Sequence, residues 1–303
     1  MLEKKQAQFP FRIVAIHTAR HGTAYHPGGA PLIPEFGPAA ASVEEFLDKA
    51  GAAIAIEITP LDPSSGEPAI SHIRAAFARG LHVVTANKGP LAYAYAALRD
   101  EALAAGVQFR FESTVMDGAP VFNMVRSTLP GAEILGFSGV LNSTTNVVLE
   151  EMENGHSMED GLDCARRLGI TEADAGYDID GWDAAAKTAA LANVLMDGHV
   201  TPMHVDVKGI RRLTPEKIAG LTSKEKTVRL VSRAHRGNGG LKMRVRAEVL
   251  DKTHPLAMAR GTTSLLLLET DLMGTLGILE TNPGVDQTAY GIFSDVADIA
   301  RSL

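Results

Sequence analysis

The chain has 303 residues, of which 45% are hydrophobic and 21% are charged, and its formal net charge is −7. These values predict a globular protein with a sizeable core, folded as one large or two ordinary domains. The acidic balance argues against a nucleic-acid partner, which would require a basic stripe. The sequence also holds no apolar run of the roughly 18 residues that a membrane span needs, so we expect no membrane partner.

The single cysteine, Cys164, excludes an internal disulfide and fits the reducing cytoplasm. It falls in a helical pattern, where a buried structural thiol is the expected role. The first residues of the sequence are charged and lack the apolar core of a signal peptide. We therefore expect a cytoplasmic protein.

Strand and helix patterns alternate in the first part of the chain. Strands are expected at residues 11–17, 52–58, 82–85 and 107–112, and helices at 42–47, 69–78 and 91–105. Short apolar strands that alternate with helices predict a parallel sheet covered on both faces. In such a sheet, ligands bind beyond the carboxyl ends of the strands. The Gly/Pro-rich segment 21–38 is expected to be a surface loop.

The pattern changes after about residue 118, where helices are followed by strands. Helices are expected at 120–128, 145–154, 158–168, 183–196 and 287–302, and strands at 227–234, 241–250, 263–272 and 274–280. This order predicts a separate α+β domain with an open, mostly antiparallel sheet. We expect an α/β protein with two domains: residues 1–117, to which residues 284–303 return, and residues 118–283.

The densest chemical signal lies between residues 172 and 187, which hold five acids and one lysine. Asp183 and Lys187 are spaced i,i+4 and therefore share one face of a helix. That helix is too apolar to be a solvated surface helix. The spacing alone leaves two interpretations open: a buried ion pair that fixes helix packing, or a proton-handling pair beside a substrate pocket.

Three further polar segments stand at the ends of predicted elements. Lys88 follows a strand, where it would meet a carboxylate or a phosphate, or else lie in an ordinary surface turn. Residues 112–120 could offer backbone carbonyls to a hard cation or act as an interdomain hinge. Residues 142–146 could bind a polar substrate, but capping of the following helix is the favoured role. The histidines show no metal-ligand spacing, so we expect no zinc site.

Seven motifs occur in one order along the chain. They are VTANKGPL at 84–91, ESTV at 112–115, GVLNSTTN at 139–146, Glu172 with Asp183 and Lys187, VKGI at 207–210, HPLA at 254–257 and TAYG at 288–291. Together they resemble the homoserine dehydrogenase family, from about residue 11 to the end. Because the sequence stops shortly after TAYG, it resembles the short form of the family without a regulatory domain.

The resemblance implies a reversible, NAD(P)-dependent interconversion of L-homoserine and L-aspartate 4-semialdehyde in the biosynthesis of threonine and methionine. It also implies a homodimer formed through the sheet of the second domain. The implied catalytic residues are Lys187, Asp183 and Lys88. The remaining implied residues are Glu172, Asp178 and Asp183 for the substrate; Thr59, Lys88, Gly169 and Gly284 for the cofactor; and Glu112, Val115, Asp117 and Ala119 for a monovalent cation such as sodium.

One departure from the family concerns the cofactor. The family's nucleotide-binding domain opens with a strand, a Gly-x-Gly-x-x-Gly turn and a helix, and this sequence has no such turn. Residues 1–7 look like the end of that helix, so we expect a Rossmann-like sheet truncated at its N-terminal side.

Three explanations of this departure remain open. The start is mis-set, the protein is a paralogue that binds a ligand without cofactor, or the enzyme holds its cofactor by other contacts. Among cofactors, NADP is slightly favoured over NAD. The reason is that Arg20 could meet a 2′-phosphate, while no acid ends strand 11–17 where a ribose would be bound.

Overall fold

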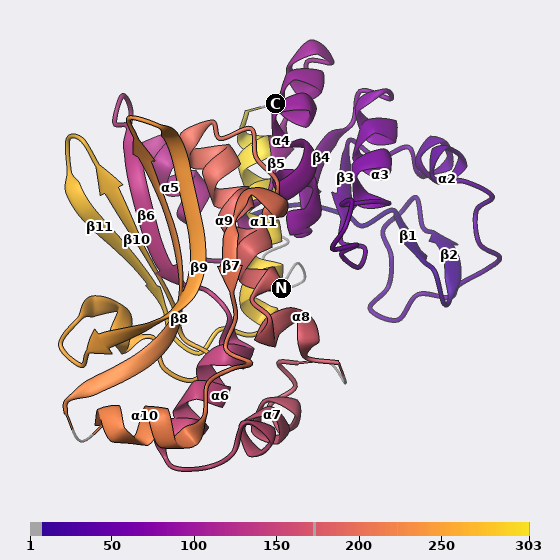
Figure 1. Cartoon of the computed structure of the whole chain (residues 1–303). Helices are drawn as coiled ribbons and strands as arrows, with labels where there is room; N and C mark the ends of the chain where they lie inside the picture. The colour runs from indigo at the N-terminus through magenta and orange to yellow at the C-terminus, as the bar shows by residue number, and fades with distance from the viewer. Residues whose placement is uncertain (1–7, 172–173, 223, 303) are drawn as a thin grey trace.

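The computed structural model describes residues 8–171, 174–222 and 224–302. A three-stranded parallel sheet and a six-stranded mixed sheet lie side by side, with helices between and around them (Figure 1). The expected α/β class is confirmed. No helix in these described ranges is long and apolar enough to cross a membrane.

The parallel sheet has the strand order β3-β4-β5. Its elements are β3 (Ile54–Glu57), α3 (Ala69–Phe77), β4 (His82–Thr85), α4 (Lys88–Ala104) and β5 (Phe109–Arg110). Helix α4 begins three residues earlier than the sequence pattern predicts. Asn87 caps it, because its side-chain oxygen accepts a hydrogen bond from the Gly89 amide at 2.9 Å. The early start places Lys88 in the first turn of a helix.

The N-terminal strand pattern forms a hairpin of its own. Strand β1 (Ala15–Thr18) pairs antiparallel with β2 (Gly22–Tyr25), and α2 (Val43–Ala50) follows. The expectation that residues 11–17 extend the parallel sheet is wrong for the described residues. The loop expected at 21–38 is wrong for residues 22–25, which form β2, whereas residues 26–38 hold no helix or strand. Gly22 allows the tight turn, since its φ is +89° and an added Cβ would lie 2.1 Å from the Gly37 carbonyl oxygen.

The six-stranded sheet has the order β11-β10-β6-β8-β9-β7. Its strands are β6 (Ile134–Val140), β7 (Asp206–Lys208), β8 (Lys226–Gly237), β9 (Gly240–Asp251), β10 (Ser264–Thr270) and β11 (Gly274–Glu280). Only β7 and β9 pair in parallel, so the sheet is mostly antiparallel as expected. Strand β6 was not predicted because two glycines weaken its strand pattern. Gly136 is required there, since a Cβ would come within 2.9 Å of the Ala234 carbonyl oxygen.

Helices α6 and α9 cover one face of the six-stranded sheet, where they contact β8. The elements of this part are α5 (Val121–Thr128), α6 (Ser143–Glu153), α7 (Met158–Arg167), α8 (Gly176–Ile179), α9 (Trp182–Met196) and α10 (Pro215–Thr222), with short 3-10 turns at η1 (Glu112–Thr114), η2 (Pro202–His204) and η3 (Pro255–Met258). One hydrophobic core runs from the parallel sheet through these helices to the larger sheet. The packing of α4 against α9 joins the two halves.

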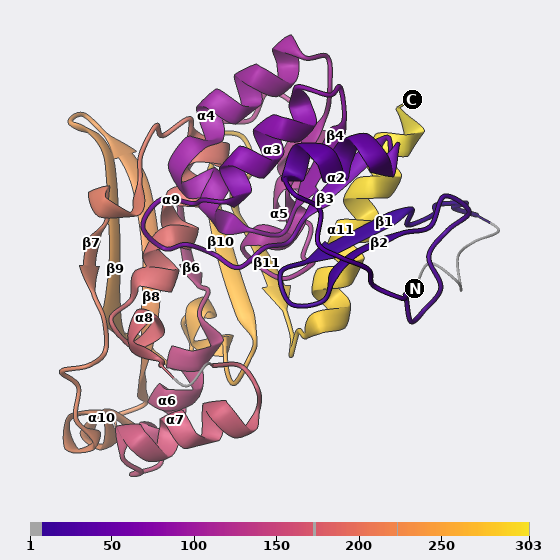
Figure 2. The ribbon, with the colours of Figure 1, turned by 90° about the vertical axis from the view of Figure 1, so that its right-hand side faces the viewer.

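The C-terminal helix α11 (Val285–Arg301) returns to the first part of the chain. Its Asp295 carboxylate accepts a hydrogen bond from the Glu112 amide at 2.7 Å. The Thr288 carbonyl accepts one from the Ser113 hydroxyl at 2.8 Å. These two bonds hold the segment that follows β5 against α11, the yellow helix of Figure 2.

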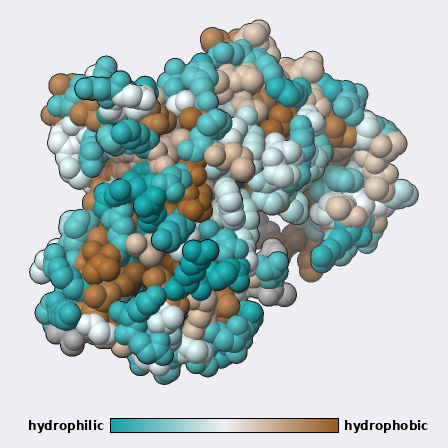
Figure 3. All heavy atoms as spheres, viewed as in Figure 1, coloured by the Kyte–Doolittle hydropathy of each residue, from teal (hydrophilic) through white to brown (hydrophobic). Residues whose placement is uncertain are grey.

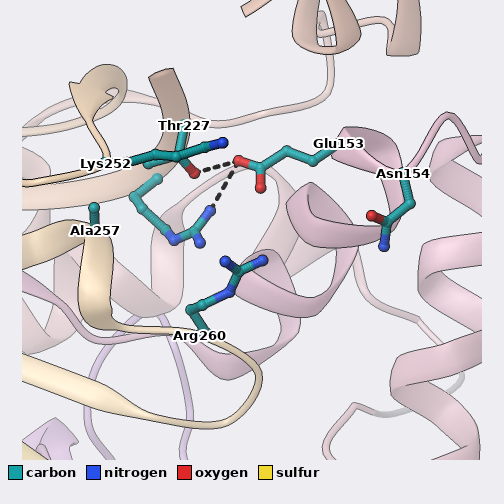
Figure 4. A pocket seen from close by; sticks show the side chains of 7 residues that line it. Glu153, Asn154, Thr227, Lys252, Ala257 and Arg260 are labelled. Carbon is teal, nitrogen blue, oxygen red and sulfur yellow. Dashed lines mark hydrogen bonds and ion pairs between the residues drawn. The ribbon is translucent and has the colours of Figure 1, made fainter. Parts of the chain in front are cut away.

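A cluster of ion pairs surrounds a cavity of about 160 Å³ between α6, β8 and η3 (Figure 4). The Arg229 side chain is 1% exposed and lies 3.1 Å from Glu153 and 3.4 Å from Glu150. Its Nε donates to the Ala259 carbonyl at 2.9 Å. Arg260 and Lys252 also line the cavity, and each pairs with an acid, Glu150 and Glu225 respectively. Because each of these cations has an acidic partner, we interpret the cluster as an ion-pair network that stabilises the packing of α6, β8 and η3.

We predict that Arg229→Met lowers the free energy of unfolding by about 3–5 kcal/mol, because it leaves two carboxylates without their buried partner. The matched control is Arg166→Met, which removes a solvent-facing pair on α7 and should cost about 1 kcal/mol or less. Urea unfolding of both variants measures the difference. Equal losses of unfolding free energy in the two variants would show that the buried ion pairs do not stabilise this packing.

Candidate active site

Asp183 lies between two lysines from different helices. Lys88 Nζ, at the start of α4, is 3.2 Å from Asp183 Oδ1, and Lys187 Nζ, on α9, is 3.3 Å from Oδ2. Lys187 also donates a hydrogen bond to the Leu141 carbonyl at 2.6 Å. The three residues expected to be catalytic therefore meet where α4 packs beside α9 (Figure 2).

The local sequence explains how α9 presents Asp183. Gly181 begins the helix in the left-handed region, with φ at +87°, which glycine adopts without strain. Asp183 then falls in the first turn, where the helix dipole stabilises a carboxylate. A run of small alanines after it lets the helix pack closely on the sheet and on α4. Lys187, one turn later, emerges on the same face.

Two opposing effects act on the Asp183 carboxyl. Burial raises its pKa, since the residue is only 8% exposed. The charges of Lys187 and Lys88, together with a hydrogen bond from Asn142, outweigh burial and hold the pKa below its usual value. Asp183 is therefore ionised at neutral pH and keeps two ammonium groups close to one point.

A second carboxylate, Asp178 on α8, lies next to this group. Asn142 Nδ2 donates to Asp178 Oδ1 at 2.7 Å and to Asp183 Oδ2 at 2.9 Å. Burial raises the pKa of Asp178, and the charge of Asp183 raises it further. Among the residues that the structure describes, no lysine, arginine or histidine forms an ion pair with Asp178. This carboxylate can therefore receive a cationic group from a ligand.

The carboxyl ends of β3 and β4 form the other side of the site. The side-chain amide of Asn87 donates to the Thr59 carbonyl at 3.0 Å, so Thr59 lies beside the turn that carries Lys88. The Thr59 hydroxyl and amide both donate to the buried Glu57 carboxylate. Thr85 donates to the other Glu57 oxygen at 2.8 Å. These bonds fix the edge of the sheet where a cofactor was expected.

The other expected ligand-binding residues are less directly connected. Gly169 ends α7 with φ at +70°, and the segment after it reaches the site, since Thr171 donates to Asp178 at 3.3 Å. Gly284 precedes α11, where its amide donates to Gln287. In the described ranges, no hydrogen bond or ion pair joins Gly284 to the Asp183 group. Glu172 lies outside the described residues.

The residues expected to bind a monovalent cation lie beside α11. Both Glu112 carboxylate oxygens accept backbone hydrogen bonds, from Phe122 at 2.8 Å and Asn123 at 2.7 Å. Burial raises the pKa of Glu112 to about 7 against these bonds. The Ala119 carbonyl accepts from the Val121 amide, and Asp117 from the Thr288 hydroxyl. The part of the chain that the structure describes contains no group of three or more His, Cys, Asp or Glu suited to a metal.

Two side chains near this site, Asn142 and Tyr177, were not singled out as site residues from the sequence, although Asn142 lies in the run 142–146 for which substrate binding was an open alternative. Asn142 caps α6 as favoured, since its oxygen accepts from the Thr145 amide at 2.8 Å, but its amino group also reaches both carboxylates. Tyr177 lies close by, and burial followed by the charge of Asp183 raises the pKa of its hydroxyl. The only available signal was the polar run at 142–146, which does not reveal contacts made across the fold.

The arrangement suits transfer of a single proton beside a bound cationic ligand. The Lys88 and Lys187 side chains are 20% and 17% exposed, so both are partly accessible to solvent. A lysine held in this way can exchange a proton with a substrate oxygen and stabilise negative charge that develops there. Asp178 supplies a place for a positive group on the same ligand.

Comparison with known proteins agrees with this geometry. The family model described as homoserine dehydrogenase matches residues 120–297. A homoserine dehydrogenase of Methanocaldococcus jannaschii is 36% identical, over 96% of this chain and 90% of its own length. An NAD(+)-dependent homoserine dehydrogenase of Pseudomonas canavaninivorans is also 36% identical, over 86% of this chain and 74% of its own.

The fold is similar as well. The crystal structure of a putative homoserine dehydrogenase from Archaeoglobus fulgidus superposes with a TM-score of 0.87, at 29% identity, over 98% of this chain and 93% of that one. This likeness extends across both sheets and the helices between them. Sequence and fold together show that the chain belongs to the homoserine dehydrogenase family.

Proposed function

We propose that the protein interconverts L-homoserine and L-aspartate 4-semialdehyde with a nicotinamide dinucleotide, as an oxidoreductase that acts on a CH–OH group. The observation that carries this proposal is the Asp183 carboxylate held by Lys88 and Lys187 at 3.2 and 3.3 Å, next to Asp178. This group offers both a proton-transfer residue and an anchor for the ammonium of an amino acid.

The residues of the chain handle the proton and the substrate, while the dinucleotide would carry the hydride. In the oxidising direction, Lys187 first releases a proton to solvent and then takes the proton of the substrate hydroxyl. In the reducing direction, its ammonium returns the proton to the aldehyde oxygen. Asp183 orients both lysines, and Lys88 adds positive charge where the oxygen becomes negative. Asp178 and Glu172 would bind the amino group of the substrate.

We predict that Lys187→Ala lowers kcat for homoserine oxidation by a factor of about 1,000 or more while the protein stays folded, because it removes the group that exchanges the proton with the substrate oxygen. Lys49→Ala is a control on α2, where the lysine forms an exposed i,i+4 pair with Glu45. Steady-state kinetics and circular dichroism check both variants. Substantial turnover by the Lys187 variant would contradict the assigned role.

For the cofactor, the proposal is an NAD(P) molecule that meets the carboxyl edge of β3 and β4. The residues present fit its nicotinamide end. The Lys88 side chain is partly accessible to solvent, and Ile56 on β3 and Ile58 just after it leave apolar surface, at 46% and 64% exposure. Thr59 and Gly169 would contact the cofactor nearby, and Gly284 from the start of α11. Arg20, in the turn between β1 and β2, supports a slight preference for NADP over NAD.

For the cation, the proposal is a sodium ion held by backbone oxygens near Val115, Asp117 and Ala119. Both carboxylate oxygens of Glu112 accept backbone hydrogen bonds at the start of α5. We therefore propose its backbone oxygen, rather than its carboxylate, as the ligand. We assign no step of the reaction to this ion.

We predict that NADP and NAD bind in calorimetric titrations, with NADP somewhat tighter, and that Arg20→Ala weakens NADP without weakening NAD. The reason is that only NADP has a 2′-phosphate for the guanidinium. An absence of binding at millimolar concentrations would instead favour a paralogue that does not use a cofactor.

Repeating the titration and the kinetics in choline chloride in place of sodium chloride tests the cation, since unchanged values would exclude it.

Two features of organisation belong to the same proposal. Contacts of α11 with η1 support domain boundaries at residues 1–117 with 284–303, and at 118–283. The free thiol of the single cysteine, Cys164, supports a reducing, cytoplasmic compartment. Cell fractionation that finds the protein outside the cytoplasm would contradict the second assignment.

We also propose that the protein is a homodimer joined through the outer face of the six-stranded sheet. On that face Leu279 of β11 pairs across the sheet with Leu265 and is 46% exposed. The space-filling view shows a broad apolar area over the lower part of this sheet (Figure 3).

We predict a mass of twice 32.1 kDa by light scattering and a shift to the monomer in Leu279→Arg. A buried, unpaired charge at the interface would oppose association. Leu103→Arg, on the exposed side of α4, serves as the control, since Leu103 is 80% exposed and distant in the chain from the sheet. A wild-type monomer would contradict the proposed dimer.

A further inference from the structure

We propose that Asn142 is a positioning residue that holds the Asp178 and Asp183 carboxylates in one fixed arrangement beside Lys187, an inference that rests on the proposed function. Its NH2 group donates to Asp178 Oδ1 at 2.7 Å and to Asp183 Oδ2 at 2.9 Å. Both hydrogens of one amide are therefore used on two like charges. Hydrogen bonds to charged groups are among the stronger ones in proteins.

The orientation of this amide is set by its other end. Asn142 Oδ1 accepts from the Thr145 amide at 2.8 Å and from the Thr145 hydroxyl at 2.9 Å. A flipped amide would point its NH2 at the Thr145 N–H and its oxygen at two carboxylates, so only one orientation satisfies every partner. Asn142 is 5% exposed, which leaves water little opportunity to replace it.

The charged and titratable groups around the two carboxylates show why a shared donor matters. Lys88 on α4 and Lys187 on α9 both pair with Asp183, whereas Asp178 forms no ion pair in the described residues. Tyr177 on α8 also faces the group, and the Thr171 hydroxyl contributes one longer bond of 3.3 Å to Asp178. The Thr144 hydroxyl and the charge of Lys187 also favour the ionised form of Asp178, but Asn142 comes before both among these causes and is the group bonded to both carboxylates.

The variant Asn142→Ser separates this role from helix capping. Serine is a favoured N-cap residue, so α6 keeps its cap. A single hydroxyl, however, can donate to at most one carboxylate. Asn193→Ser is the matched control on α9. The Asn193 amide donates to the Leu91 and Val200 carbonyls at 2.8 and 2.9 Å, and its oxygen accepts from the Val200 amide, so it makes similar bonds but none to a carboxylate.

The kinetic test compares the two variants with wild type on homoserine. We expect Asn142→Ser to lower kcat/KM by about 10- to 100-fold, with KM raised, and to move the acid limb of the pH profile to higher pH. The reason is that the lost bond had favoured the ionised form of Asp178. Asn193→Ser should leave the pH profile in place. An unmoved acid limb in Asn142→Ser, or an equal shift in Asn193→Ser, would overturn the proposal.

A direct titration does not depend on activity. Carbon-13 NMR of the protein labelled at its aspartate carboxyls, with Asp178→Asn to assign the resonance, follows the ionisation of Asp178. We expect Asp178 to titrate at higher pH in Asn142→Ser than in wild type, and an unchanged titration would overturn the role of Asn142. A wild-type protein that does not turn over homoserine contradicts the proposed function instead, so the two failures are distinguishable.

Discussion

The contact of the Asp183 carboxylate with two lysines is the interaction on which the rest of the site depends. A carboxylate with 8% exposure would be protonated or expelled without opposite charge nearby. Lys187 comes with Asp183 on the same helix, but Lys88 comes from α4, in the half of the molecule built on the parallel sheet. The two halves must therefore dock in one orientation, which the packing of α4 against α9 sets.

Helix α4 carries a local conflict that this contact resolves. Lys88 occupies the first turn of the helix, where the dipole disfavours a cation. Asp183 occupies the first turn of α9, where the dipole favours its charge. The ion pair between them offsets the unfavourable position of Lys88. Departures of this kind from local rules are expected at functional sites, where position matters more than local stability.

The sequence patterns predicted the elements that depend on residues close together in the chain. They missed the elements that depend on contacts between residues far apart in the chain. The apolar residues of β8 to β11 and the helix pattern of α2, which Ser42 caps, are signals that lie within a few residues. Strand β6 was missed because Gly136 weakens its strand pattern. The reason for this glycine is its close approach to the Ala234 carbonyl, about a hundred residues further along the chain. In the site, the i,i+4 spacing made Asp183 and Lys187 visible together. The contact of Asn142 with Asp178 could not be predicted, because the sequence signal for helix capping is the same whether or not the side-chain amide reaches Asp178.

The proton-transfer group and the proposed cofactor site differ in how many of their contacts the chain itself supplies. The proton-handling group is complete within the chain, because Asp183 has two cations and Asn142 bonds both carboxylates. On the cofactor side, the Thr59 hydroxyl and amide are already held by Glu57, and the remaining surface is the apolar edge of β3. A ligand there would gain affinity mainly from apolar contact and from the Lys88 charge. Cofactor binding would therefore depend on the sheet edge, while the geometry of proton transfer is set by the packing of α4 and α9.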